Sequence, residues 1–102
     1  MQSYKITEDA KVDLIEIAHY TLNKWGKETF IKYRNGLEKA FNAITKQTTV
    51  KKTFSEKLSN VFVKKYKHHY IFYINQKNTV IIIAVIHEKR DILSHLTRRL
   101  ES

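Results

Sequence analysis

Cysteine and proline are absent from the sequence, and only two of its 102 residues are glycine. The absence of cysteine excludes a disulfide framework, thiolate metal sites and a cysteine nucleophile, and it fits a reducing cytoplasm. Hydrophobic residues make up 42% of the chain, which together with the scarcity of glycine and proline is the opposite of a disordered composition. The chain is therefore expected to fold.

Long hydrophobic runs are also missing. The longest apolar stretch covers residues 80–86, which is far shorter than a membrane span. Residues 1–7 are polar and contain no apolar signal-peptide region. We therefore expect a cytoplasmic protein that neither crosses a membrane nor is exported by a visible signal.

Negative charge is in short supply, because ten Asp and Glu face nineteen Lys and Arg. The formal net charge of +9 indicates an acidic partner. Nucleic acid, an anionic membrane surface and an acidic protein segment all meet that requirement. Charge alone does not separate these three classes of partner.

The length allows one hydrophobic core and is too short for two, so residues 1–102 are expected to form a single domain. Residues 4–6 alternate as a short strand, and Thr7 is a good N-cap for a helix over residues 8–25. The apolar face of that helix is expected to hold Ala10, Leu14, Ile17, Ala18 and Trp25.

A second helical pattern follows Gly26, which can adopt a positive φ where the first helix ends. Its apolar positions fall on one helical face and are Phe30, Tyr33, Leu37, Ala40, Phe41 and Ile44. The two helices are expected to form an antiparallel hairpin. Because each is amphipathic, the hairpin must be covered by another layer, and the remainder of the chain offers a sheet.

Residues 45–60 show little periodicity and are expected to form a loop with a helical turn at residues 55–58. Strands are expected at residues 61–63, 69–74 and 80–86, with a hairpin turn at residues 75–78. The last strand is continuously apolar and should lie inside the sheet. A short helix over residues 91–100 should follow, capped by Asp91, with its apolar side chains inward at Ile92, Leu93, Leu96 and Leu100. The fold class is α+β in the order β-α-α-β-β-β-α, with an antiparallel-rich sheet.

Specific residues carry a resemblance beyond this order. The opening combines a strand, a Thr-x-x-Ala-x-x-Asp-Leu motif, an aromatic residue and Trp-Gly, at Tyr4, Ile6, Thr7, Ala10, Asp13, Leu14, Ile17, Tyr20, Trp25 and Gly26. The pattern continues at Tyr33, Leu37 and Phe41, in the His-Tyr-Ile-Phe-Tyr run of residues 69–73, and at Ile86, His87, Arg90 and Asp91. Together these residues resemble the RelE/ParE toxin superfamily, and its ParE branch more than its ribosome-dependent RNases. The resemblance covers nearly the whole chain outside residues 45–60.

The resemblance implies a RelE/ParE-like fold and a cytoplasmic toxin of a type II toxin-antitoxin system. It implies a cognate antitoxin whose disordered tail folds along the toxin surface, and operator DNA reached only through that complex. In the ParE branch the implied target is DNA gyrase, bound by protein contact so that replication stops. This hypothesis requires no catalytic residue, no metal and no cofactor.

An mRNA endonuclease of the RelE type, acting in the ribosome, is the alternative. RNA cleavage needs cations around the scissile phosphate and a group that moves the 2′-hydroxyl proton. The candidate residues are Lys64, Lys65, His68, His69, His87 and Arg90. A RelE-like nuclease typically keeps sheet arginines and a late aromatic residue, whereas this sequence has four arginines and no Tyr or Trp after Tyr73.

Structural roles are weighed beside these functional ones. Neighbouring residues in a strand point to opposite faces, which places Lys64 opposite Lys65 and argues against a metal ion shared by His68 and His69. His87, at the end of a strand, is expected to satisfy a loop backbone group. The aromatic side chains of Tyr70, Phe72 and Trp25 are expected to pack in the core, and a nucleic-acid stacking platform is their less favoured role.

Basic residues near the end of the chain are candidates for contact with the target or partner. Arg98 and Arg99 are expected to form an exposed basic end of the last helix. Arg90 belongs either to this contact or to a local ion pair with Asp91. The predicted contact set is Lys64, Lys65, Arg90, Arg98 and Arg99. A third hypothesis, a non-toxic basic protein that binds nucleic acid, is supported by charge alone.

Overall fold

The computed structural model describes residues 3–46 and 52–101. Helices and strands follow one another along the chain in nearly the order that the sequence predicts. In order they are β1 (Ser3–Ile6), α1 (Glu8–Trp25), α2 (Lys27–Thr45), β2 (Lys52–Thr53), η1 (Glu56–Leu58), β3 (Phe62–Tyr66), β4 (His69–Gln76), β5 (Thr79–His87) and α3 (Ile92–Glu101). The α+β class and the predicted order are confirmed, with one added strand.

That added strand lies within the segment expected to be a loop. Lys52 and Thr53 of β2 pair antiparallel with β3 at the edge of the sheet. The helical turn predicted in the same segment is confirmed as the 3-10 helix η1. Residues 47–51 of the predicted loop lie outside the described residues.

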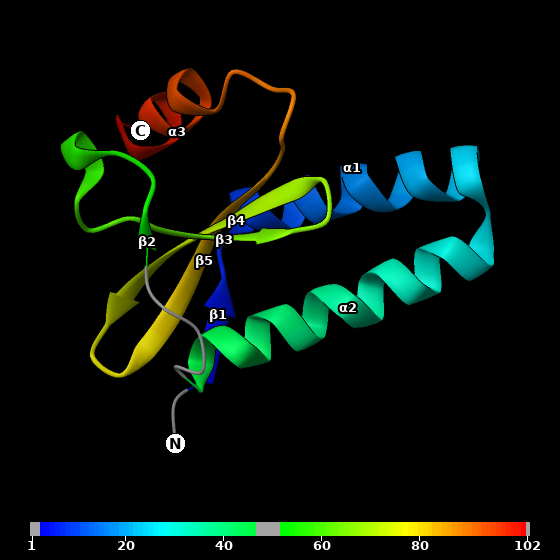
Figure 1. Cartoon of the computed structure of the whole chain (residues 1–102), viewed down its shortest axis with the longest axis horizontal. Coiled ribbons are helices and arrows are strands. Elements are labelled where there is room, and N and C mark those ends of the chain that lie inside the picture. The colour runs from blue at the N-terminus through cyan, green and yellow to red at the C-terminus, as the bar shows by residue number, and fades with distance from the viewer. Residues whose placement is uncertain (1–2, 47–51, 102) are drawn as a thin grey trace.

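The helical hairpin is fixed by the residues that the sequence singles out. The Thr7 hydroxyl accepts a hydrogen bond from the Ala10 amide at 3.1 Å, which caps α1. Gly26, with φ of +93°, ends α1 and starts α2 without an intervening loop. Figure 1 shows the two helices running back along each other and meeting at a turn that lies well beyond the sheet.

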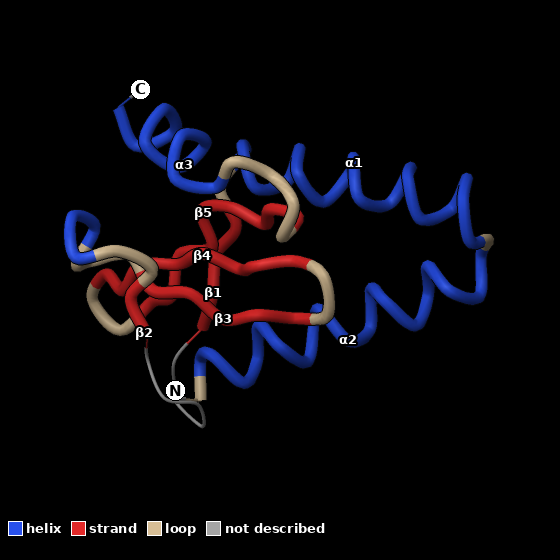
Figure 2. The backbone as a smooth tube through the Cα atoms, turned by 45° about the horizontal axis from the view of Figure 1, so that its top comes forward, coloured by secondary structure: helices blue, strands red, loops and turns tan. Residues whose placement is uncertain are grey.

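The five strands form one sheet in the order β1-β5-β4-β3-β2. Strand β1 runs parallel to β5, and the other three pairs are antiparallel. Strand β5 is therefore interior, as its continuous apolar sequence predicts. Lys77 and Asn78 have positive φ in the predicted turn between β4 and β5. Figure 2 shows the strands with α1 and α3 on one side in that view and α2 on the other.

Each face of the sheet carries its own core. The hairpin covers one face, where Leu37, Phe41 and Ile44 of α2 pack with Ile71 and Ile82. The other core contains side chains from β4, β5, α3 and the start of β3, and its buried members are Val61, Phe72, Ile83, Ala84, Ile86, Ile92 and Leu96. The predicted core role of Phe72 is confirmed, and Tyr70 packs against this second core.

A β-bulge interrupts the pairing of β4 with β5. Tyr73 pairs with Ile82 and Phe72 with Ala84, so Ile83 is an extra residue in β5. Ile83 and Ala84 consequently point to the same face. Strand β1 pairs with β5 only as far as Ile82, so none of the described strands lies beside the second half of β5 on that edge.

Three predicted core positions are wrong. Trp25 is 62% exposed because α1 outreaches the sheet and its last turn has nothing to pack against. Leu93 and Leu100 are also exposed. Only Ile92 and Leu96 of the predicted apolar set point inward, since α3 rests on the sheet along a narrow stripe.

Candidate functional site

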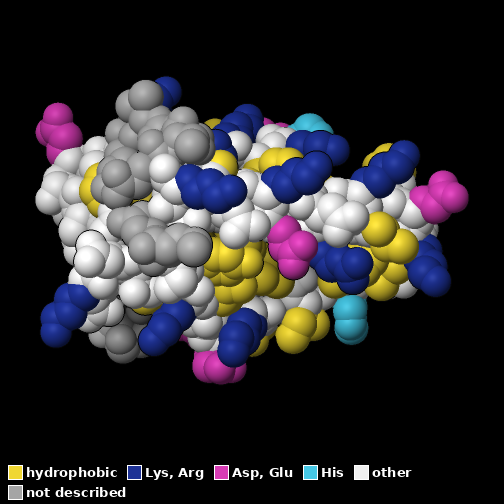
Figure 3. All heavy atoms as spheres, turned by 90° about the horizontal axis from the view of Figure 1, so that it is seen from below, with side chains coloured by type: hydrophobic (Ala, Val, Ile, Leu, Met, Phe, Trp, Pro, Cys, Tyr) yellow, Lys and Arg dark blue, Asp and Glu magenta, His cyan; other side chains and the backbone are white. Residues whose placement is uncertain are grey.

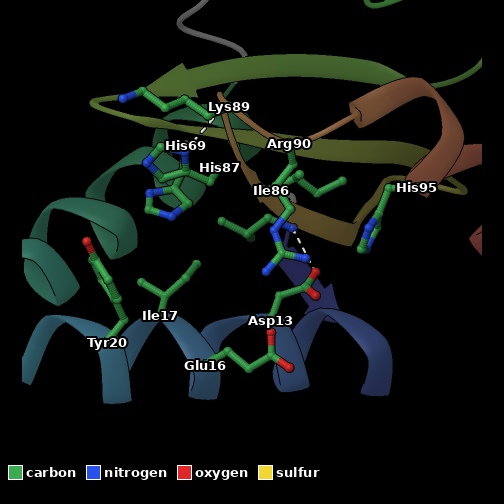
Figure 4. Close-up of a pocket in the computed structure, with 11 residues that line it drawn as sticks. Asp13, Glu16, Ile17, Tyr20, His69, Ile86, His87, Lys89, Arg90 and His95 are labelled. Atoms are coloured by element: carbon green, nitrogen blue, oxygen red, sulfur yellow. Dashed lines mark hydrogen bonds between the residues drawn. The ribbon is translucent and has the colours of Figure 1, made fainter. Parts of the chain in front are cut away.

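A cleft of about 410 Å³ opens between α1 and the uncovered edge of β5, and the loop from β5 to α3 forms its rim. Figure 4 shows Asp13, Glu16, Ile17 and Tyr20 rising from α1 on one side, with the histidines and Arg90 opposite. Its lining from the sheet, the loop and α3 comprises His69, Val85, Ile86, His87, Lys89, Arg90 and His95. The cleft thus gathers three of the candidate residues, His69, His87 and Arg90.

An ion pair between α1 and α3 forms one end of the cleft. The Arg99 guanidinium donates to both carboxylate oxygens of Asp13, at 2.6 and 3.1 Å, and to the Ile83 carbonyl at 3.1 Å. Asp13 also accepts the Val85 amide at 3.0 Å. Asp13 and Arg99 thus bind two backbone groups at the edge of β5, the Val85 amide and the Ile83 carbonyl. None of the described strands pairs with these two groups. The hydrogen bond to Asp13 raises the pKa of Arg99, so its guanidinium stays protonated.

The expected exposed basic end is therefore wrong for Arg99, whose side chain is mostly buried against Asp13. Arg98, one position earlier on α3, is exposed as predicted. The reason is helical geometry, since neighbouring residues of a helix point about 100° apart and only one can face the sheet.

The three candidate histidines meet where β3, β4 and β5 end at the same side of the sheet. The ring centroid of His87 lies 5.1 Å from that of His69 and 6.3 Å from that of His68. Each ring nitrogen Nδ1 already has a partner. That of His69 is hydrogen-bonded to the Tyr33 hydroxyl, that of His68 contacts Glu88 at 2.7 Å, and that of His87 accepts the Lys89 amide at 3.1 Å. The predicted backbone role of His87 is confirmed.

The protonation states of the three histidines and their neighbours depend on the burial of His69 and on the Glu88 carboxylate. Burial first, then the neighbouring His87 and His68, lowers the pKa of His69 to about 4, so its ring is neutral at pH 7. Hydrogen bonds from Lys65 and His68 lower the pKa of Glu88 to about 2. Lys65 lies 2.9 Å from Glu88, and its pKa is raised by the same contact.

The candidate cations do not converge on one point. Lys65 pairs with Tyr70 across β3 and β4, whereas Lys64 pairs with Ile71, so the two side chains lie on opposite faces as predicted. The Arg90 side chain points into the cleft toward Asp13 and Glu16 (Figure 4), and it makes no ion pair with Asp91 within the described part of the chain. Asp91 caps α3 instead, accepting the Ser94 amide.

This arrangement is poorly suited to cleaving RNA. A phosphate at the histidine cluster would meet Glu88 there and Asp13 and Glu16 across the cleft, while Lys65 and Arg99 are already paired with carboxylates. Within residues 3–46 and 52–101, no three His, Asp or Glu side chains are placed to hold a metal ion. None of the helices in those ranges is long and apolar enough to cross a membrane.

Sequence reasoning missed the roles of Asp13, Glu88 and Tyr33. Asp13 could have been found, because its spacing from Ala10 and Ile17 puts a carboxylate on the buried face of α1 and a buried carboxylate requires a cation. The contacts of Glu88 and Tyr33 join residues 20 and 36 positions apart. No periodic pattern connects such residues.

Three comparisons with known proteins agree. The family model described as the ParE toxin of type II toxin-antitoxin system, parDE, matches residues 4–92. The chain is 28% identical over 102 residues to the Escherichia coli protein named Toxin ParE, across 99% of each chain. A solved chain from the chromosomal ParDE TA system of P. aeruginosa superposes with a TM-score of 0.69 and 15% identity, covering 85% of this chain and 96% of that one.

Proposed function

Because the chain belongs to the ParE toxin family of type II toxin-antitoxin systems, we propose that it acts by binding DNA gyrase and thereby blocks replication. One observation favours binding over RNA cleavage. Several of the acid-base and cationic groups that a nuclease would need are engaged within the protein, with His69 on Tyr33, and with His68 and Lys65 on Glu88. Such a toxin would act through exposed side chains that bind its target.

A cognate antitoxin is the second partner in this proposal. The similar solved structure is titled as a ParDE toxin-antitoxin system, and this chain shares its fold. Figure 3 shows one face of the molecule on which basic side chains surround open apolar patches. Such a surface suits an acidic amphipathic segment, which would cover the apolar side chains and neutralise the charge. With both of these partners, the proposal implies a cytoplasmic protein.

Of the cations predicted to meet these partners, Lys65, Arg90 and Arg98 are exposed, and Lys65 is paired with Glu88. Arg90 is the best placed, because its side chain enters the cleft and holds no ion pair in the described ranges. We expect Arg90→Ala to weaken gyrase inhibition without changing the fold. Thermal unfolding of the variant provides the control.

The testing experiment adds the purified protein to DNA gyrase and, in parallel, to ribosomes programmed with mRNA. We expect inhibited supercoiling or trapped gyrase-DNA breaks, with the mRNA intact. The single variants His68→Ala and His87→Ala should retain toxicity within about twofold, because general acid-base catalysis would otherwise lose about 10²- to 10⁴-fold. Codon-specific mRNA cuts with unaffected gyrase would instead establish the nuclease.

A further inference from the structure

The far end of the helical hairpin exposes large apolar side chains. Trp25 is 62% exposed, Tyr20 is 56% exposed, and Leu22 is exposed between them in sequence. Figures 1 and 2 place the turn at Gly26 away from the sheet, at one extremity of the molecule. We call Tyr20, Leu22, Lys24 and Trp25 the hairpin tip. Neither core cluster includes any of these four residues.

Lys24 holds the two aromatic rings of the tip in place. Its ammonium donates to the Tyr20 hydroxyl at 2.9 Å and lies 5.4 Å from the centroid of that ring. It also lies 5.5 Å from the centroid of the Trp25 ring. These contacts favour one arrangement of the two rings before a partner arrives, which would lower the entropy that binding costs.

The charge around the tip is strongly biased. Residues 19–34 contain one carboxylate, Glu28, against four cations, which are Lys24, Lys27, Lys32 and Arg34. An apolar surface with ordered aromatic rings and surrounding cations complements an apolar pocket with an acidic rim. Trp and Tyr are also the residues that most often supply the binding energy at protein interfaces.

We propose that the hairpin tip is the surface that contacts gyrase, with the Trp25 ring inserted into an apolar pocket that has acidic residues at its rim. This inference rests on the proposed function and deepens it. Tyr20 also lines the cleft, so the contact extends from the tip toward Arg90. Arg90, an exposed cation of the cleft, thereby joins the same surface.

A protein partner explains the tip better than a nucleic acid does. Nucleobases stack on free ring faces. Here Lys24 is hydrogen-bonded to the Tyr20 hydroxyl and lies beside the Trp25 ring, so a base stacking on either ring would have to fit around its side chain. Leu22 shares a helix face with Trp25, three positions on, and adds aliphatic surface there that base stacking does not use and that a protein pocket would bury.

The test titrates DNA gyrase with Trp25→Ala, Trp25→Phe and wild-type protein and measures the concentration that halves supercoiling. We expect Trp25→Ala to raise that concentration about 30-fold or more, as for an interface anchor, and Trp25→Phe to restore part of the loss. The matched control is Leu100→Ala, which shortens an exposed apolar side chain on α3 and should change the concentration by less than about twofold. Equal unfolding temperatures of the three tip proteins would show that the fold is retained.

Each other outcome contradicts the assignment in a distinguishable way. Undiminished inhibition by Trp25→Ala would overturn the role of the tip and leave gyrase as the target. Failure of the wild-type protein to inhibit gyrase would overturn the proposed function itself, and the tip assignment with it. Loss of single-stranded DNA binding, or of a dimer in size-exclusion chromatography, with inhibition unchanged would reassign the tip to nucleic acid or to a second copy.

Discussion

Asp13 is only 8% exposed, and its buried carboxylate is stable there because Arg99 and the Val85 amide supply its hydrogen bonds. An unpaired buried charge costs several kcal/mol. We therefore expect Arg99→Leu to reduce the free energy of unfolding in urea by about 3 kcal/mol. Arg98→Leu, the neighbouring exposed arginine, is the control and should change stability by less than about 0.5 kcal/mol. Similar values for the two variants would refute a structural role for the pair.

Gly36 illustrates a close approach between α2 and β3. A Cβ atom added to Gly36 would overlap the Tyr66 hydroxyl and ring. Glycine to alanine normally stabilises a helix interior by about 1 kcal/mol. Here we expect Gly36→Ala to destabilise the protein by about 1–2 kcal/mol in urea unfolding, because the ring must move. In a Tyr66→Ala background the same substitution should become stabilising, and persistence of the loss would point to another cause.

His69 should make stability depend on pH. Its pKa is lowered to about 4 in the folded protein, so between pH 6.5 and 4 the unfolded chain binds a proton that the folded one does not. The contribution of neutral His69 is complete above that range and is lost as the pH falls through it. Urea unfolding between about pH 7 and pH 5 should show a flatter dependence for His69→Gln than for wild type.

The exposed His19 provides the control for that measurement. His19→Gln should retain the wild-type dependence on pH, because its side chain lies on the solvent face of α1. Glu88 affects stability at lower pH. Its pKa is lowered to about 2, so its contribution to the free energy of unfolding is lost only below about pH 4.5. A flatter curve for His19→Gln than for His69→Gln would contradict the assignment.

At the scale of elements, α3 has one buried stripe. Leu96 is fully buried and Leu100 is 43% exposed. We expect Leu96→Ala to cost about 3 kcal/mol of unfolding free energy, because it leaves a cavity between α3 and the sheet. Leu100→Ala should cost less than about 1 kcal/mol. Equal losses would mean that α3 is rotated relative to this description.

The comparison of α1 and α3 shows what the sequence predicts and where it stops. Helix caps and helix ends are determined by a few neighbouring residues. Thr7, Gly26 and Asp91 therefore predicted the corresponding helix ends correctly. Periodicity assigned Trp25 to the apolar face of α1 and so to the core, but it could not show that the sheet ends before the helix does. Whether an apolar face is covered depends on the lengths of two elements that pack together, which is a tertiary property.

The candidate site was predictable in part for the same reason. His69, His87 and Arg90 stood out as chemistry-bearing residues at strand ends, and they do line one cleft. The partner of His69 is Tyr33, which lies 36 positions away on α2. The sequence therefore predicted the members of the cluster and not this contact.

For the whole molecule, the formal net charge of +9 dominates long-range behaviour. Association with an acidic partner surface should be steered by this charge and slowed by salt, with dissociation changing less. Stopped-flow mixing with gyrase at about 50 and 300 mM KCl should show an association rate that falls at least about tenfold. A rate independent of salt would show that steering plays no part.

The second half of β5 has a side chain from α1 and one from α3 where a neighbouring strand would lie. Bare strand edges template the addition of further chains, which is how sheets grow into fibrils. At this edge Asp13 and Arg99 hold the Val85 amide and the Ile83 carbonyl, so an incoming strand would first have to break a buried ion pair. The Asp13–Arg99 ion pair thus disfavours polymerisation along that edge, in place of an additional strand.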